Sequence, residues 1–145
     1  MSKDFKEFIA LLNSNKVAYL IVGGYAVGFH GYPRYTGDLD IWVQMSVENA
    51  NRLINTLADF GFGRANFSID DFLRPYQILQ LGYPPFRIDI ITSIDGVIFE
   101  ECYVHHVLMK VDELLVPIIG IADLRKNKLA TGRSKDRLDW ENLQP

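Results

Sequence analysis

The spacing of apolar residues changes along the chain between a helical period and short continuous runs. Apolar side chains recur every three or four positions from Phe5 to Leu12, which predicts an amphipathic helix over residues 3–14. The apolar run 18–22 is typical of a buried strand. The small residues that follow it allow a tight turn and then a short helix starting near Gly24.

The central part of the chain shows the clearest pattern. Residues 38–43 predict a strand with carboxylates on one face. Ser46 is a good N-cap for a strongly amphipathic helix that ends at Gly61. Residues 76–82 and 86–94 predict two further strands, and the intervening "YPP" indicates a hairpin or a short connection.

The C-terminal part carries weaker signals, which predict short strands at 107–111 and 116–121 and a helix over 122–132. A last short helix is expected to begin with Ser134 as its N-cap and to bury Leu138 and Leu143. The expected order along the chain is therefore helix, strand, helix, strand and helix, followed by several strands and then by two helices. This order predicts an α+β (mixed α/β) domain built on one short mixed sheet with flanking helices.

Composition places the chain among ordinary globular proteins. Its 145 residues suit one domain over 1–145, and 48% apolar with 23% charged residues argues against disorder. The net charge of −3 gives no global basic signal, so any nucleic-acid contact would need a local patch. We find no signal peptide and no apolar run near the ~20 residues of a membrane span, and therefore expect a cytoplasmic protein without membrane contact.

Cys102 is the single cysteine of the chain. It has one chemical interpretation, as a nucleophile beside His105 or His106. A half-buried small side chain is the commoner fate of a lone cysteine, and we favour it.

Two aspartates stand at the start of the strand 38–43. Asp38 and Asp40 are two residues apart, so on a strand they project to the same face. Two carboxylates a few ångström apart repel by about 4 kcal/mol at an effective dielectric near 20. A magnesium ion between them would relieve this repulsion, because it prefers carboxylate oxygens. The alternative is a pair of solvated aspartates at a strand start.

A third carboxylate, Asp89, lies inside the apolar segment "RIDII". A buried aspartate is costly unless it is paired or binds metal. If its strand lies beside the strand 38–43, three carboxylates converge. The alternative is an ion pair of Asp89 with Arg87 or Arg34.

Gly23 and Gly24 separate the apolar run 18–22 from the expected short helix. A strand, glycines and a helix start leave backbone N–H groups free to bind an anion such as phosphate. The spacing does not match the dinucleotide-binding fingerprint, and the lysine of a P-loop is missing. A simple tight turn is the alternative. Together with the carboxylates, a phosphate cradle is typical of metal-assisted phosphoryl or nucleotidyl transfer.

These motifs resemble the polymerase-beta-type nucleotidyltransferase superfamily. The shared pattern is an apolar residue and two small residues at 22–24, Asp-apolar-Asp-apolar at 38–41, and a later aspartate between apolar residues at 88–90. The tail "LRKNKLATGRSKDRLDWENL" also resembles the small bacterial branch found in abortive-infection and toxin–antitoxin systems. The first likeness covers residues 1–95, and the second extends it to the whole chain.

The resemblance implies a nucleotidyltransferase-like fold and a role for each motif. Asp38 and Asp40 would hold two magnesium ions, and Asp89 would bind the catalytic metal and take the proton of the attacking hydroxyl. Gly23 and Gly24 would bind the triphosphate of a nucleoside triphosphate through their amides. A nucleoside monophosphate would then pass to the acceptor.

Several residues outside these motifs are candidates for helping roles. Arg34 would reach a phosphate or pair with Asp38, and Thr36 would bond a carboxylate or turn the chain. Lys128 and Arg133 are the best candidates for phosphate contacts within a basic cluster that Asp136 and Asp139 interrupt; the alternative is a solvated helical face. For His30 we favour a packed or capping role, and four tyrosines, Tyr32, Tyr35, Tyr76 and Tyr83, are candidates for stacking on a base.

The sequence therefore favours a magnesium-dependent nucleotidyltransferase whose hydroxyl acceptor is an RNA, a protein or a small molecule. A toxin–antitoxin role would bring a partner protein encoded nearby. Two alternatives stay open. One is a catalytically silent binding or regulatory protein that kept the fold, and the other is a metal-dependent phosphohydrolase, which would not need the glycine cradle.

Overall fold

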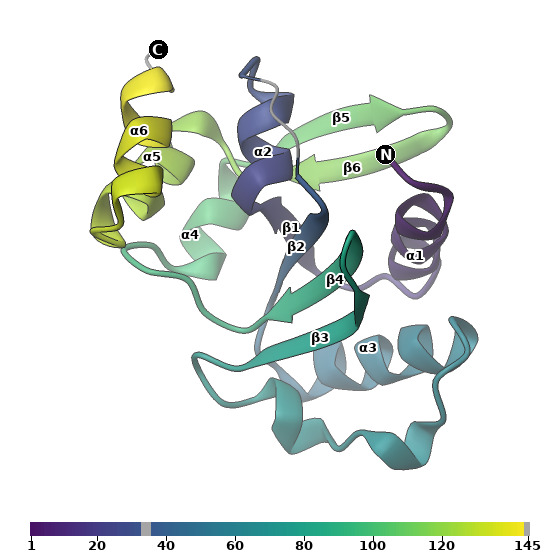
Figure 1. Cartoon of the computed structure of the whole chain (residues 1–145). Coiled ribbons are helices and arrows are strands. Elements are labelled where there is room, and N and C mark those ends of the chain that lie inside the picture. Colours follow the sequence, from purple (N-terminus) through teal and green to yellow (C-terminus); the bar gives the residue numbers. More distant parts are fainter. Residues whose placement is uncertain (33–35, 144–145) are drawn as a thin grey trace.

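The computed structural model describes residues 1–32 and 36–143. Over these ranges helices and strands alternate as far as α3, two strand pairs follow with α4 between them, and two helices come last (Figure 1). The helices are α1 (Lys3–Ser14), α2 (Gly23–Phe29), α3 (Val47–Asp59), α4 (Phe99–Val104), α5 (Ile121–Ala130) and α6 (Ser134–Asn142), with 3-10 turns η1 (Arg64–Asn66) and η2 (Ile69–Phe72). The strands are β1 (Tyr19–Val22), β2 (Asp38–Val43), β3 (Ile78–Tyr83), β4 (Phe86–Ile91), β5 (Val107–Val111) and β6 (Leu114–Ile118).

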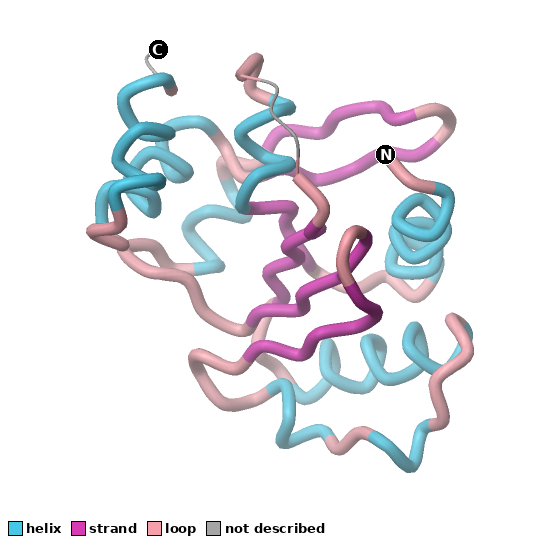
Figure 2. The backbone as a smooth tube through the Cα atoms, in the orientation of Figure 1, coloured by secondary structure: helices cyan, strands magenta, loops and turns pink. Residues whose placement is uncertain are grey.

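The strands form one mixed sheet in the order β3-β4-β2-β1-β6-β5 (Figure 2). Strand β2 is antiparallel to β1 and parallel to β4, and β6 runs parallel to β1. The two outer pairs, β3–β4 and β5–β6, are antiparallel hairpins. The sheet therefore places β2 and β4 side by side, although 42 residues separate Val43 from Phe86 in the sequence.

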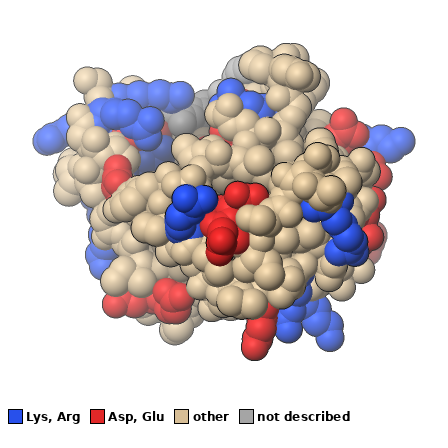
Figure 3. Space-filling model, turned by 90° about the horizontal axis from the view of Figure 1, so that it is seen from below, with Lys and Arg blue, Asp and Glu red and all other residues tan. Residues whose placement is uncertain are grey.

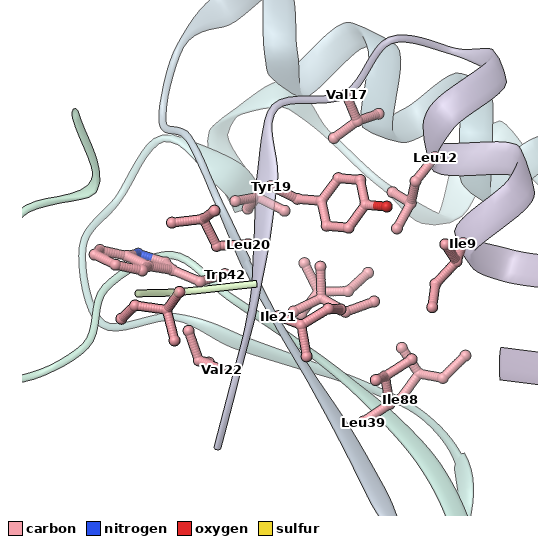
Figure 4. Close-up of a cluster of buried hydrophobic side chains, with 14 of the residues drawn as sticks. Ile9, Leu12, Val17, Tyr19, Leu20, Ile21, Val22, Leu39, Trp42 and Ile88 are labelled. Atoms are coloured by element: carbon pink, nitrogen blue, oxygen red, sulfur yellow. The ribbon is translucent and has the colours of Figure 1, made fainter. Parts of the chain in front are cut away.

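One face of the sheet packs on α1 and forms a large part of the core. Figure 4 shows Ile9 and Leu12 of α1 facing Ile21, Leu39 and Ile88 of three neighbouring strands. All five side chains are at most 4% exposed. Burial of a large aliphatic side chain contributes about 1.5–3 kcal/mol, so this layer fixes the strand register that the opposite face inherits.

The opposite face of β2, β4 and β3, here called the site face, carries polar side chains. Because side chains alternate along a strand, burying Leu39 and Ile41 turns Asp38 and Asp40 to the site face. The same alternation in β4 buries Ile88 and Ile90 and turns the intervening carboxylate toward that face. The site face therefore gathers Asp38, Asp40, Arg87, Asp89, Ile91 and Ile78 through strand pairing alone.

The predicted α+β architecture, a mixed sheet with flanking helices, is confirmed. The helix 3–14 and the strand 38–43 are found within the same bounds, and Ser46 caps α3 by accepting a hydrogen bond from the Asn49 N–H at 3.1 Å. The hairpin expected around "YPP" is the β3–β4 pair. The predictions missed α4 and the two 3-10 turns, whose short sequences carry no clear periodicity.

The last helix is the element that differs most from the prediction. Arg133, not Ser134, is the N-cap residue, and Leu138 is 58% exposed, while Leu143 is buried as expected. The inward positions belong instead to Asp136 and Asp139, which are 4% and 3% exposed. These carboxylates are buried in place of Leu138 because Lys128 of α5 forms ion pairs with both of them.

Three further observations concern single predictions. His30 is the C-cap residue of α2, and its Nε2 lies 2.7 Å from the carbonyl oxygen of Ile119, in keeping with a packed or capping role. Cys102 is only 1% exposed, so its side chain is buried more completely than the half-buried position favoured from the sequence. Within the described part of the chain, no helix is long and apolar enough to cross a membrane.

Candidate active site

A cavity of about 540 Å³ opens on the site face between the sheet and the C-terminal helices. Its wall includes the start of α2, the first residues of β2, the middle of β4, the segment after β4, and parts of α5 and α6. All the described residues that the sequence proposed for binding metal or phosphate line this one cavity, namely Gly23, Gly24, Thr36, Asp38, Asp40, Asp89, Lys128 and Arg133. Arg34, also proposed, lies outside the described residues.

Gly23 allows a carboxylate to lie directly against the start of α2. A Cβ atom at this position would lie 2.0 Å from Oδ2 of Asp40, closer than any real contact allows. Its φ of +66° is also a conformation that favours glycine. The glycine is therefore required twice, once for the turn out of β1 and once for the close approach of Asp40.

Asp40 and Asp89 are direct register partners across the parallel strands β2 and β4. Burial raises the pKa of Asp40 to about 7, and the negative charges of Asp89 and Asp38 act in the same direction. Lys128 and Arg87 act in the opposite direction without outweighing these effects. The three carboxylates thus form one electrostatically coupled group with an excess of negative charge.

Arg87 partly neutralises this group from its outer side. Its Nε donates to Oδ1 of Asp89 at 2.8 Å, and its Nη2 donates to Oδ2 of Asp38 and to Oδ2 of Asp89, each at 3.0 Å. The hydrogen bonds to Asp89 come first among the causes that raise the pKa of Arg87 above its ordinary value. The ion pair of Asp89 with Arg87, one of the alternatives from sequence, is therefore present together with the convergence of the carboxylates.

The carboxylates of the cavity can be compared with what a metal ion requires of its ligands. As they stand in residues 1–32 and 36–143, no three Asp, Glu, His or Cys side chains are grouped closely enough to hold one ion. The guanidinium of Arg87 bridges two of the carboxylates, and a divalent ion would have to compete with it. The donor chemistry fits magnesium nonetheless, since the group offers only carboxylate oxygens, and burial together with the neighbouring carboxylates raises the pKa of Asp40.

Thr36 takes the second of the two roles considered for it. Its hydroxyl donates to the backbone carbonyl oxygen of Asp38 at 3.3 Å. It therefore shapes the chain just before β2 and reaches no carboxylate by this bond. The side chain still lines the cavity.

Lys128 of α5 is buried, at 5% exposure. Its Nζ lies 3.0 Å from Oδ1 of Asp136 and 3.2 Å from Oδ2 of Asp139, and both carboxylates belong to α6. Arg133 and Thr131 add contacts to Oδ2 of Asp136, each at 2.7 Å. Lys128 therefore does not lie on a solvated helical face, which was the alternative for this basic cluster, whereas the side chain of Arg133 is 74% exposed.

Sequence reasoning missed the role of Asp136, which also lines the cavity. Burial alone would raise its pKa, but hydrogen bonds from Thr131 and Lys128 and the charges of Lys128 and Arg133 lower it overall. A signal existed in the sequence, because Asp136 and Asp139 are three residues apart and share one face of a helix. That face points to Lys128 rather than to solvent.

Charge on the surface is mixed rather than of one sign. On the face shown in Figure 3, acidic and basic groups are interspersed with uncharged surface. A basic group lies at its upper left, on the side where Figure 1 shows α5 and α6. This distribution agrees with the net charge of −3 and with the absence of a global basic signal in the sequence.

Comparison with solved structures gives the chain its structural class. The fold is similar to TM1012 of Thermotoga maritima, provisionally assigned as a nucleotidyltransferase, with a TM-score of 0.65, 14% identity, and coverage of 97% of this chain and 91% of that one. It is also similar to lincomycin-bound LnuA, a lincosamide antibiotic adenylyltransferase, with a TM-score of 0.57, 17% identity, and coverage of 99% and 96%. The sequence itself matches no protein-family model and no curated relative. The chain therefore has the nucleotidyltransferase-like fold that the motifs implied.

Proposed function

We propose that this protein is a magnesium-dependent nucleotidyltransferase that moves a nucleoside monophosphate from a nucleoside triphosphate to a hydroxyl acceptor. The observation that carries the proposal is the meeting of Asp38, Asp40 and Asp89 from two adjacent strands beside Gly23 in one cavity. A fold shared with an adenylyltransferase supports it.

The carboxylates would act as metal ligands and as a proton acceptor. Asp38, Asp40 and Asp89 would hold two magnesium ions once Arg87 leaves its present partners. Bound magnesium would neutralise the phosphate oxygens and lower the barrier to attack. A carboxylate oxygen of Asp89 would take the proton of the acceptor hydroxyl. The hydroxyl oxygen would form a bond to the α-phosphorus while the bond from that phosphorus to the leaving pyrophosphate breaks.

The phosphate groups would lie along the opposite wall of the cavity. The first N–H groups of an α-helix have no partner within the helix, so Gly23 and Gly24 would offer amides to the triphosphate. Lys128 and Arg133 would supply positive charge, and Thr36 would shape the entry to β2. Arg34 would also contact a phosphate, and this role is proposed only because Arg34 lies just before β2 in the sequence.

The acceptor would be an RNA, a protein or a small molecule. LnuA adenylylates a lincosamide antibiotic, which makes a small hydroxyl-bearing acceptor one candidate. A role in a toxin–antitoxin system, with a partner protein encoded nearby and a cytoplasmic location, rests on the likeness of the C-terminal segment to that branch of the superfamily.

A second candidate, a catalytically silent binding protein, is favoured by the Arg87 bridge. A guanidinium that holds Asp38 and Asp89 already satisfies two carboxylates without an ion. In that case nucleotide would bind without being cleaved.

Binding of the four common nucleoside triphosphates, measured by calorimetry with and without magnesium, tests the proposal. The wild type should bind at least one of them only with magnesium, and Asp38→Ala/Asp40→Ala should lose that binding. Equal binding by both proteins would overturn the proposal. Binding without any cleavage, even with cell extract added as a source of acceptor, would favour the silent alternative.

A further inference from the structure

One end of the cavity is apolar and aromatic, unlike the charged remainder. Tyr76, Ile78 and Ile91 line it. Tyr76 is 69% exposed and Ile78 is 60% exposed, although large apolar side chains are usually buried. An exposed apolar patch within a cavity marks a surface that a ligand covers.

Strand pairing explains why these side chains share the site face. In β3, Leu79 and Leu81 pack toward the core, so Ile78 points to the opposite side. Ile78 is the register partner of Ile91, and the next position on the site face of β4 is Asp89. The apolar floor is thus continuous with the carboxylates.

Tyr76 precedes β3 and extends this floor. Its φ of +58° is uncommon for a residue other than glycine. Of the four tyrosines considered as base-stacking candidates, Tyr35 lies outside the described residues, and Tyr76 is the one of the other three that lines the cavity.

We propose that Tyr76 and Ile78 form the nucleobase subsite, in which the base stacks on the ring of Tyr76 and packs on Ile78. This inference rests on the proposed function, since it divides that same cavity between the two ends of one nucleotide. The phosphates take the end with Gly23 and Lys128, and the base takes the end at β3.

The dimensions of the cavity support this division. The order β3-β4-β2-β1 places three strand spacings, roughly 14 Å, between the apolar end and the strand that leads into α2. That span suits an extended nucleoside triphosphate. A volume of about 540 Å³ is within the roughly 300–1,000 Å³ typical of sites for one small ligand. The acceptor would then enter from the open side.

A comparison of two ligands tests the subsite separately from the phosphate end. The probes are magnesium tripolyphosphate, which has no base, and whichever of the four common nucleoside triphosphates the wild type binds most tightly. Tyr76→Ala should weaken binding of the nucleotide by roughly 5- to 150-fold, the range that the loss of one base–aromatic stack gives. Binding of tripolyphosphate should stay within about twofold, because the contacts to phosphate are untouched.

Three further variants complete the experiment. Tyr76→Phe keeps the ring and should bind like the wild type, as should Tyr83→Ala, which removes an 86% exposed tyrosine outside the cavity lining. Ile78→Thr, which suits a strand, should also weaken the nucleotide selectively and serves if Tyr76→Ala does not fold. Unchanged nucleotide affinity in a folded Tyr76→Ala or Ile78→Thr protein would overturn the subsite. A wild type that binds neither probe would overturn the proposed function itself.

Discussion

Asp40 and Asp89 stand opposite each other as register partners in the adjacent parallel strands β2 and β4. Neither is a surface residue, since Asp89 is 7% exposed and Asp40 is half-buried. The fold therefore holds two like charges together at a cost to its own stability, which is expected where a ligand supplies the compensating charge.

Replacing Asp40 by asparagine should stabilise the metal-free protein. The substitution keeps the shape and removes a buried charge next to Asp38 and Asp89. At pH 8 with a chelator present, we expect a gain on the order of 2 kcal/mol in the free energy of unfolding, measured with urea. The same variant should lose binding of magnesium nucleotide. A less stable Asp40→Asn protein would show that the carboxylate is needed for folding instead.

Gly23→Ala should disrupt the site more than its backbone strain alone explains. Its Cβ would meet Oδ2 of Asp40 at 2.0 Å, in addition to a left-handed φ of +66° that costs about 1–2 kcal/mol. Gly61→Ala is a matched control, because Gly61 has a φ of +112° and no neighbouring atom within 4 Å of the place that a Cβ would take. Both variants should be less stable, and only Gly23→Ala should lose nucleotide affinity. Equal affinities in the two variants would contradict the close-approach role of Gly23.

Asp136→Asn should destabilise the protein by about 3 kcal/mol at pH 7, since it leaves Lys128 buried beside one fewer carboxylate. The pKa of Asp136 is lowered in the folded state. Its contribution to stability is therefore complete above the pKa of the unfolded chain, about 4, and is lost as the pH falls through the lower folded value. The difference between the wild type and the variant should shrink accordingly in acid.

Glu141→Gln is the control for this measurement. Glu141 lies 4.0 Å from Arg137 in an exposed pair one turn apart on α6, and such a pair contributes little. Its loss should change stability by less than about 0.5 kcal/mol at every pH tested. A pH-independent loss in Asp136→Asn, or a loss in Glu141→Gln of similar size, would argue against the buried ion pair as the cause.

Cys102 should resist thiol reagents in the native protein. It is 1% exposed, and burial, followed by the nearby charge of Asp123, raises the pKa of its thiol to about 12. Since the thiolate is the reactive form, labelling with a disulfide reagent at pH 8 should proceed only as fast as the protein opens. In guanidinium the thiol should react at once. Rapid stoichiometric labelling of the folded protein would revive the nucleophile interpretation.

The sequence predicted the placement of the three carboxylates on the sheet better than it predicted the C-terminal helices. Strand periodicity alone placed Asp38 and Asp40 on one face and Asp89 between two core residues. Their convergence depended only on whether two strands were neighbours. In α6 the pattern failed because an ion pair with Lys128 reversed the usual rule, burying Asp136 and exposing Leu138. The spacing of Asp136 and Asp139 marked a shared helix face, but it did not show that Lys128 of α5 would lie against that face.

Arg87 shows a second limit of sequence reasoning. From the sequence, an ion pair of Arg87 with Asp89 was an alternative to the convergence of Asp89 with Asp38 and Asp40. The structure contains the ion pair and the convergence together, because residues 87 and 89 share a strand face. Which one operates when nucleotide binds depends on a competition between two cations, which no pattern in the sequence encodes.

The fate of the α-phosphate tests the central claim most directly. The protein is incubated with magnesium, cell extract as a source of acceptor, and each of the four nucleoside triphosphates labelled at the α-phosphate, with Asp89→Asn as the inactive comparison. The account predicts that the wild type releases pyrophosphate and transfers the α-label to an acceptor, and that Asp89→Asn does neither. No pyrophosphate from any of the four, or equal release by the two proteins, would contradict it.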